Sequence, residues 1–185
     1  MSKIYVDEIL PKENAQITAP NLQLPAGSVV QVVQTVQDAI GNYSAPTQGS
    51  VTSAIMSASI TPTSSSSKIL VTGHVNGSAD SKGHAWWIIL QRDGSAVGTG
   101  ATAGNRRLCH SGFSQYLNNY AECLGHGTIN YLDSPATTSA VTYSVVLGHN
   151  SGGGQQFNLN RTQIDGDNND RPRSTSIITL MEIAG

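Results

Sequence analysis

Short segments rich in β-branched residues recur along this chain, each ended by turn-forming residues, and they constrain the fold more than any other feature of the sequence. Segments of this length, composition and spacing are typical of β-strands. No stretch combines a helical period of apolar residues with start and stop signals for a helix. The chain is therefore expected to be all-β.

The expected strands cover residues 29–36, 51–60, 68–75, 84–91, 96–100, 106–116, 121–132, 138–148, 155–160 and 174–184. The clearest turn is Asp93-Gly94, because Asp-Gly suits the tight turn of a β-hairpin. Between the first two strands, Gly41-Asn42 and Pro46 indicate a loop. This number of strands favours a β-sandwich or barrel, and a jelly roll has the matching strand count.

The last segment, Ser174–Ala184, alternates so that both faces of the expected strand are largely apolar. One face would carry Ile177, Thr179, Met181 and Ile183, and the other Ser176, Ile178, Leu180 and Glu182. A strand with two apolar faces needs cover on both sides, so it is expected near the centre of a sheet with a second layer or another subunit over it. Alternation alone leaves open which face is turned inward.

Composition limits the range of functions. The chain has 185 residues, enough for one domain and a short extension, with 12% charged residues and a formal net charge of -2. Because Lys and Arg are scattered, neither a nucleic acid nor an anionic membrane is an expected partner. The longest apolar run, Trp86–Leu90, is far shorter than the roughly 20 residues that cross a bilayer. Asp7 and Glu8 lie where a secretory signal needs an apolar run, so folding in a cytoplasm is expected.

Residues 1–27 differ from the rest and are expected to form an extended N-terminal arm, with residues 28–185 as the head domain. Pro11, Pro20 and Pro25 interrupt the arm. Its apolar residues are too thinly spaced to form a core alone, and they are the candidates for docking to another surface: Ile4, Val6, Ile9, Ile17, Leu22 and Leu24.

Two clusters invite a metal-site hypothesis, and both depart from known ligand patterns. Asp165–Asp170 offers oxygen ligands for calcium but lacks the glycine at the sixth position and the late glutamate of an EF-hand loop, so a polar connection is favoured. Cys109-His110 and Cys123 with His126 offer zinc ligand types at a spacing that matches no standard module. No cofactor or metal is therefore expected, and a Cys109–Cys123 disulfide remains open. The other histidines, His74, His84 and His149, are expected at the surface or at an interface.

Catalysis is not expected either. The sequence has no Gly-x-Ser-x-Gly elbow, and Gly152-Gly153-Gly154 lacks the lysine and the helix of a phosphate-binding loop. Neighbouring positions on a strand face opposite ways, so one of Trp86 and Trp87 is expected in the core. The other indole is expected at a subunit contact, with a sugar platform as the alternative.

Several of these stretches resemble bacteriophage virion proteins, in particular the small fibre-like and decoration proteins of marine and cyanobacterial phages. The stretches are Ile4–Ile9, Leu24–Val32, Ser57–Pro62, Ser67–Val71, Leu90–Gly94, Leu132–Pro135 and the closing Ser174–Ala184. The resemblance implies a homotrimer with a jelly-roll head, similar to the tumour-necrosis-factor and complement globular folds, and an N-terminal segment that anchors it to the particle. It carries no catalytic motif.

This resemblance, taken with the features above, implies a noncatalytic phage virion structural protein at the virion surface, assembled in the host cytoplasm. It would be a short trimeric fibre or knob whose arm docks to capsid or tail proteins and whose heads contact a host-surface glycan; the alternative is a capsid decoration protein. The candidates for the trimer interface are Ile177, Ile178, Leu180, Met181, Ile183, Trp86 and Trp87.

Overall fold

A computed structural model describes residues 24–45, 47–79, 85–114, 123–150 and 155–185 of the chain. These residues form strands and no helix, which confirms the all-β prediction. Within these ranges there is accordingly no helix that could cross a membrane. The strands are β1 (Val29–Gln37), β2 (Gly41–Ala45), β3 (Met56–Ile60), β4 (Lys68–Ala79), β5 (Ala85–Arg92), β6 (Ser95–Val97), β7 (Ser111–Ser114), β8 (Gly125–Asp133), β9 (Val141–His149), β10 (Gln155–Leu159) and β11 (Ser176–Ile183).

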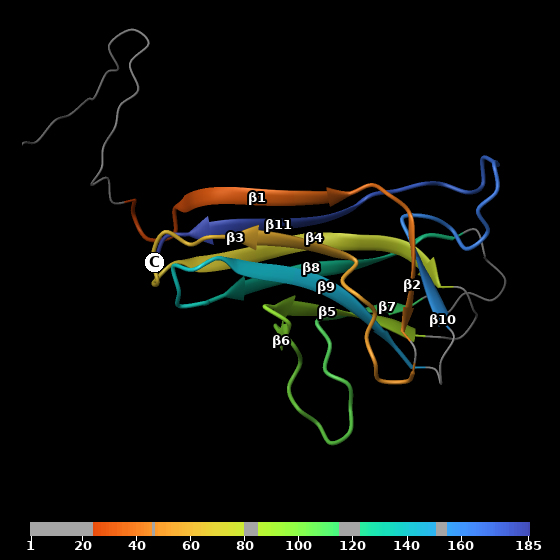
Figure 1. Ribbon diagram of the computed structural model, residues 1–185, viewed down its shortest axis with the longest axis horizontal. Helices are drawn as coiled ribbons and strands as arrows, with labels where there is room; N and C mark the ends of the chain where they lie inside the picture. Colours follow the sequence, from red (N-terminus) through yellow and green to blue (C-terminus); the bar gives the residue numbers. More distant parts are fainter. Residues whose placement is uncertain (1–23, 46, 80–84, 115–122, 151–154) are drawn as a thin grey trace, which may run out of the picture.

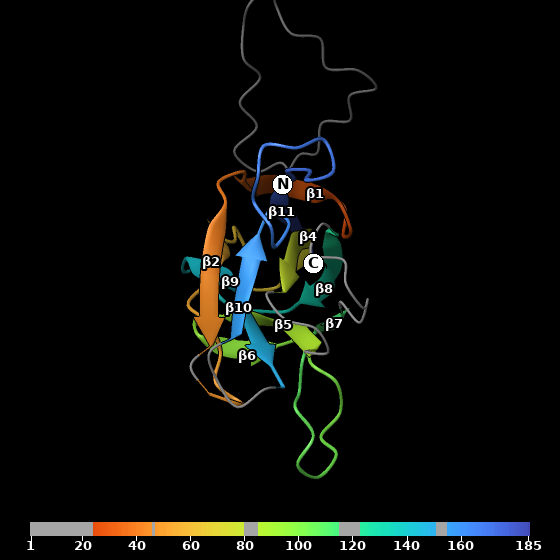
Figure 2. The same cartoon turned by 90° about the vertical axis from the view of Figure 1, so that its right-hand side faces the viewer.

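The strands form two antiparallel sheets (Figure 1). The larger sheet has the order β1-β11-β4-β10-β2, and β8 pairs with the other edge of β4. The smaller sheet has the order β3-β9-β5-β6, with β7 also on β5. Viewed along the strands, the two sheets curl around a common interior (Figure 2).

The strand β11 is an interior strand of the larger sheet, as its two apolar faces predicted. It pairs with β1 along one edge and with β4 along the other. Ile178 and Leu180 face the smaller sheet and have no exposed surface. The inward face is therefore the Ile178/Leu180 set, which alternation alone did not decide.

The core between the sheets is built from alternate residues of the long strands. On β9 the predicted buried face is confirmed, since Val141, Tyr143, Val145 and Leu147 are all buried. At one end, the Trp86 ring lies 4.9 Å from that of His149 and 5.6 Å from that of Phe157, measured between centroids. Such tilted aromatic contacts add to the stabilisation that burial of the rings provides.

The structure corrects the expected strand boundaries in the N-terminal third. Gly41–Ala45, read as a loop, is the strand β2, because it pairs along its whole length with β10 at the edge of the larger sheet. Conversely, the expected strand over 51–60 is regular only from Met56, and Val51 makes a single bridge to Gly148. In both places pairing with a distant segment outweighs the local pattern.

The predicted hairpin turn between β5 and β6 is confirmed. Asp93 and Gly94 both have positive φ, 48° and 82°. A type I′ turn requires positive φ at both central residues, and its twist matches that of the flanking strands. The Asp93 side chain also accepts a hydrogen bond from the Thr142 N–H (2.9 Å), which ties the turn to β9.

Candidate functional site

The outer face of the larger sheet carries an apolar row that crosses four strands in register. Val32 on β1 is the partner of Met181 on β11, which is the partner of Leu70 on β4, which is the partner of Leu132 on β8. The two ends of the row are well exposed, Val32 at 56% and Leu132 at 49%. A single exposed leucine is ordinary on a protein surface, but an aligned row offers a continuous surface to a partner.

Two parallel rows extend this surface. One joins Val36 to Ile177 and His74, and the other joins Val29 to Ile183 and Lys68. Val29 and Val36 are about half exposed.

The outward positions of β1, β4, β8 and β11 hold no acidic side chain; the basic residues among them are Lys68, His74 and His126. We call the surface formed by these outward positions the outer face of the larger sheet. Its chemistry suits burial against another protein surface, because few charged groups would lose water there.

The structure separates the predicted interface residues into two groups. Ile177, Met181 and Ile183 lie on the outer face, half-buried. Ile178, Leu180 and Trp86 lie in the core of the chain itself and are at most 1% exposed. A side chain without exposed surface has no area to offer another copy, so these three are corrected to core residues. Trp87 is half-buried on the outer face of the smaller sheet, opposite to Trp86, as alternation predicted.

Of the predicted docking residues, Ile4, Val6, Ile9, Ile17 and Leu22 lie outside the described residues. Leu24 is 43% exposed. It precedes a turn in which the Ser28 N–H donates to the Pro25 carbonyl (3.1 Å) and Gly27 has a positive φ of 89°. The Gly27 N–H also donates to the Ala184 carbonyl (2.7 Å), so the chain enters β1 beside the end of β11.

A buried carboxylate holds the connection between β3 and β4 against the larger sheet. Glu182 of β11 has no exposed surface and accepts hydrogen bonds from Gln31 Nε2 (2.6 Å), the Thr63 N–H (2.8 Å) and Thr63 Oγ1 (2.7 Å). Burial alone would raise the pKa of Glu182, but the hydrogen bonds from Gln31, Ser67 and Thr63 outweigh burial and lower the pKa. Sequence reasoning assigned Glu182 no such role, because Gln31 and Thr63 lie far from it in the chain.

Glu182→Gln should destabilise the fold by about 1–3 kcal/mol at neutral pH, because an amide offers one acceptor oxygen where several donors converge. The folded-state pKa is lowered, so the stabilisation is present above the unfolded pKa of about 4.3 and is lost as pH falls through the folded pKa. Denaturant titrations between pH 7 and pH 3 should therefore show the difference between wild type and variant shrinking with acid. A difference that stays constant over this range would contradict the assignment.

A second buried carboxylate joins the two sheets. Asp133, at the end of β8, accepts hydrogen bonds from Arg92 Nη1 (2.8 Å) on β5 and from the Tyr143 hydroxyl (2.7 Å) on β9. Burial, and then the hydrogen bond to Asp133, raises the pKa of Tyr143, so its hydroxyl keeps the proton that it donates. Sequence reasoning did not predict this contact, because Arg92, Asp133 and Tyr143 lie on different strands.

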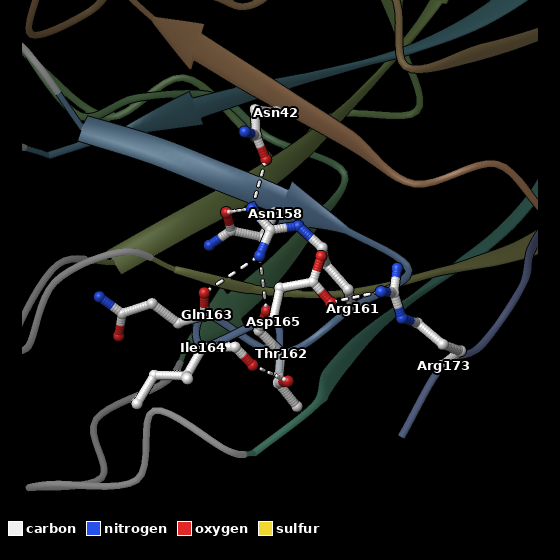
Figure 3. Close-up of polar contacts among 8 residues, drawn as sticks. All are labelled: Asn42, Asn158, Arg161, Thr162, Gln163, Ile164, Asp165 and Arg173. Carbon is white, nitrogen blue, oxygen red and sulfur yellow. Dashed lines mark hydrogen bonds and ion pairs between the residues drawn. The ribbon is translucent and has the colours of Figure 1, made fainter. Parts of the chain in front are cut away.

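Arg161 organises the connection between β10 and β11 (Figure 3). Its Nη1 donates to the carbonyls of Thr162 and Gln163, both at 3.0 Å. Its Nη2 donates to the side-chain oxygens of Asn42 and Asn158, both at 2.7 Å. The guanidinium thereby fixes the start of the connection to β2 and β10.

Asp165, the first residue of the cluster considered for calcium, pairs with Arg173 across the same connection (Figure 3). Among the described residues, no three His, Cys, Asp or Glu side chains lie close enough to share a metal ion. The first residue of the Asp165–Asp170 segment is thus engaged in an ion pair.

The cysteine and histidine cluster considered for zinc is used differently. Cys109 and Cys123 are not joined in a disulfide, and both are half-buried. His110 Nε2 accepts from the Asn130 N–H (3.1 Å) and its Nδ1 lies 2.9 Å from the Gly98 carbonyl, so both ring nitrogens are engaged. These contacts attach the segment before β7 to the edge of β8.

The other histidines do not all follow the surface prediction. The prediction that His149 lies at the surface or at an interface is wrong. His149 has no exposed surface, and its Nε2 lies 2.9 Å from the Ala45 carbonyl. His74 lies on the outer face of the larger sheet. His84 lies outside the described residues.

A scan against protein-family models found no matching family, and a search of curated proteins found no significant relative.

Proposed function

We propose that the protein is a noncatalytic phage virion structural protein, a short homotrimeric fibre or knob that displays its heads at the virion surface. The outer face of the larger sheet carries this proposal, because an in-register apolar row between Val32 and Leu132 is suited to contact with other copies. In this proposal, residues 1–27 dock to capsid or tail proteins. The assignment to a phage particle rests on the stretches that resemble phage virion proteins.

The strand order supports a jelly-roll head. Without β2, β6 and β10, the sheets read β1-β11-β4-β8 and β3-β9-β5-β7. Counted along the chain, these eight strands pair first with eighth, second with seventh, third with sixth and fourth with fifth. Nested pairing of this kind is what two Greek keys produce in a jelly roll.

In the proposed trimer, the outer faces of three copies meet around a threefold axis. Burial there would stabilise association, since a fully buried Val, Leu or Met side chain contributes about 1.5–3 kcal/mol. Lys68 lies at the end of β4, so it reaches solvent at the rim of such a contact. The proposal that three copies associate rests on the resemblance to the trimeric jelly-roll folds.

Met181→Asp should dissociate the trimer, because it places a charge at the centre of the apolar row. Ser57→Asp is the matched control, since Ser57 is exposed on β3 in the other sheet. Sedimentation equilibrium should give three times the 19.4 kDa chain mass for wild type and Ser57→Asp, and the chain mass for Met181→Asp. A monomeric wild type would refute the trimer, and a trimeric Met181→Asp would refute this face as its contact.

The position on the particle decides between the fibre and the alternative, a capsid decoration protein. Both use the same head and the same arm, but a decoration protein covers the shell in many copies and a fibre is present in few. Counting the copies by electron microscopy of intact particles, with the protein labelled, separates the two.

A further inference from the structure

We propose that Trp87 and Arg107 form a binding site for an acidic polysaccharide on the outer face of the smaller sheet. This site lies on the sheet opposite to the proposed trimer contact, and binding at it requires no second copy. Only the biological use of this site rests on the proposed function, since a head displayed on a particle would present the site to a surface.

The two positions that pair directly with Trp87 across the smaller sheet carry no side chain. Both are glycines, Gly112 on β7 and Gly148 on β9. A Cβ at Gly148 would fall 2.2 Å from Trp87 Nε1, so the indole fills the space of the missing side chain. A Cβ at Gly112 would meet nothing within 4 Å, so the other side of the indole is open.

The Trp87 indole has a hydrogen-bonding group to offer as well as its ring. Its Nε1–H makes no hydrogen bond to any residue that the structure describes. Trp87 is half-buried, unlike Trp86, which is enclosed in the core. A half-buried indole with an unused donor is suited to a ligand that has both an apolar face and hydroxyl groups.

Arg107 supplies a positive charge beside this surface. It is exposed, and its Nη1 donates to the Gly49 carbonyl (2.9 Å), in a position that a Cβ at Gly49 would block. Gly49 precedes Val51, which bridges Gly148 under the indole. With paired strands about 5 Å apart and about 3.8 Å per residue, Gly49, which binds Arg107, lies within about 18 Å of Trp87.

Two neutral hydrogen-bonding residues lie close to these two along the chain or the sheet. Gln48 precedes Gly49, and the Asn150 N–H donates to the carbonyl of Ala85, two residues before Trp87. Gln48 is exposed, and its Nε2 donates to the carbonyl of Asn150, which is also exposed (3.2 Å). The connection 98–110, drawn in green where it extends away from the sheets, contains Arg106 and Arg107 and no acidic residue (Figures 1 and 2). Its remaining guanidinium N–H groups allow Arg107 to bind a carboxylate in the bidentate manner that arginine favours.

The ligand chemistry follows from this combination. The CH groups on one face of a sugar ring pack on an indole, sugar hydroxyls match Gln48, Asn150 and Trp87 Nε1, and a carboxylate matches Arg107. A chain of uronic acids has all three features in each unit. A neutral glycan lacks the partner for Arg107.

The test uses the full chain and two probes, hexagalacturonate and neutral maltohexaose. Titration followed by the Trp87 indole N–H signal in NMR and by calorimetry should show saturable binding of hexagalacturonate, at least about tenfold tighter than maltohexaose. Hexagalacturonate that leaves the Trp87 signal unchanged, or maltohexaose that binds equally well, would overturn the proposal.

Two adjacent exposed arginines provide a matched pair of variants. Arg107→Gln should weaken hexagalacturonate binding about tenfold, whereas Arg106→Gln, which removes the same charge one residue away, should change it less than about twofold. Trp87→Ala should also abolish the preference for hexagalacturonate over maltohexaose. The unfolding midpoint of this variant checks that it is folded. Equal effects of the two arginine variants would mean attraction by net charge and would overturn the site. A trimer that fails to bind would contradict this site alone, and a binding monomer would contradict the trimer alone.

Discussion

Leu180→Asp should leave the protein largely unfolded at neutral pH, because Leu180 has no exposed surface and faces the core from the central strand β11. Truncating a buried leucine costs about 2–5 kcal/mol, and an unpaired carboxylate in the core costs several more. The total is comparable to the about 5–15 kcal/mol by which whole domains are stable. Circular dichroism and denaturant titration at pH 7 would measure the loss.

The neighbouring position gives the control. Met181 lies on the outer face of the same strand and is only half-buried, so the Met181→Asp chain should still fold, with a loss of less than about 2 kcal/mol apart from the loss of association. The two variants add the same charge one residue apart, and they differ only in the face that receives it. Two variants with equal unfolding midpoints would contradict the assignment of inner and outer faces.

Asp133→Ala should destabilise the fold by about 3–5 kcal/mol, because the Arg92 guanidinium and the buried Tyr143 hydroxyl lose their common acceptor. The Arg92 side chain is 32% exposed and recovers some hydration, which favours the lower end of the range. Since Asp133 joins β8 of the larger sheet to β5 and β9 of the smaller sheet, the loss falls on the contact between the sheets. Chemical denaturation at pH 7 would measure it.

Tyr143→Phe separates the two interactions of Asp133. This variant removes one hydrogen bond and keeps the ring in the core, so the expected cost is about 1 kcal/mol. In the Tyr143→Phe background, Asp133→Ala should cost less than in wild type, because one of its partners is already gone. Strictly additive costs would mean that the two groups do not interact as the distances indicate.

Alternation predicted the strands with one strongly buried face and their inward residues. Val141 to Leu147 on β9 and the Asp93-Gly94 turn were predicted because burial and turn geometry act on neighbouring residues. The strand β2 was missed because its pairing with β10 comes from a segment more than 100 residues later. The candidate site was foreseen only in part: Ile177, Met181 and Ile183 were named, whereas Val32, Leu70 and Leu132 were not.

The sequence by itself determined that the chain is all-β, that its last strand has two apolar faces, and that Trp86 and Trp87 point to opposite sides. These properties repeat every second residue along a strand, so they can be read locally. Only the tertiary structure decided which face of β11 is inward, and which residues of β1, β4 and β8 continue Met181 into one row. Register between distant strands is set by the packing of the whole sheet, and no local pattern contains it.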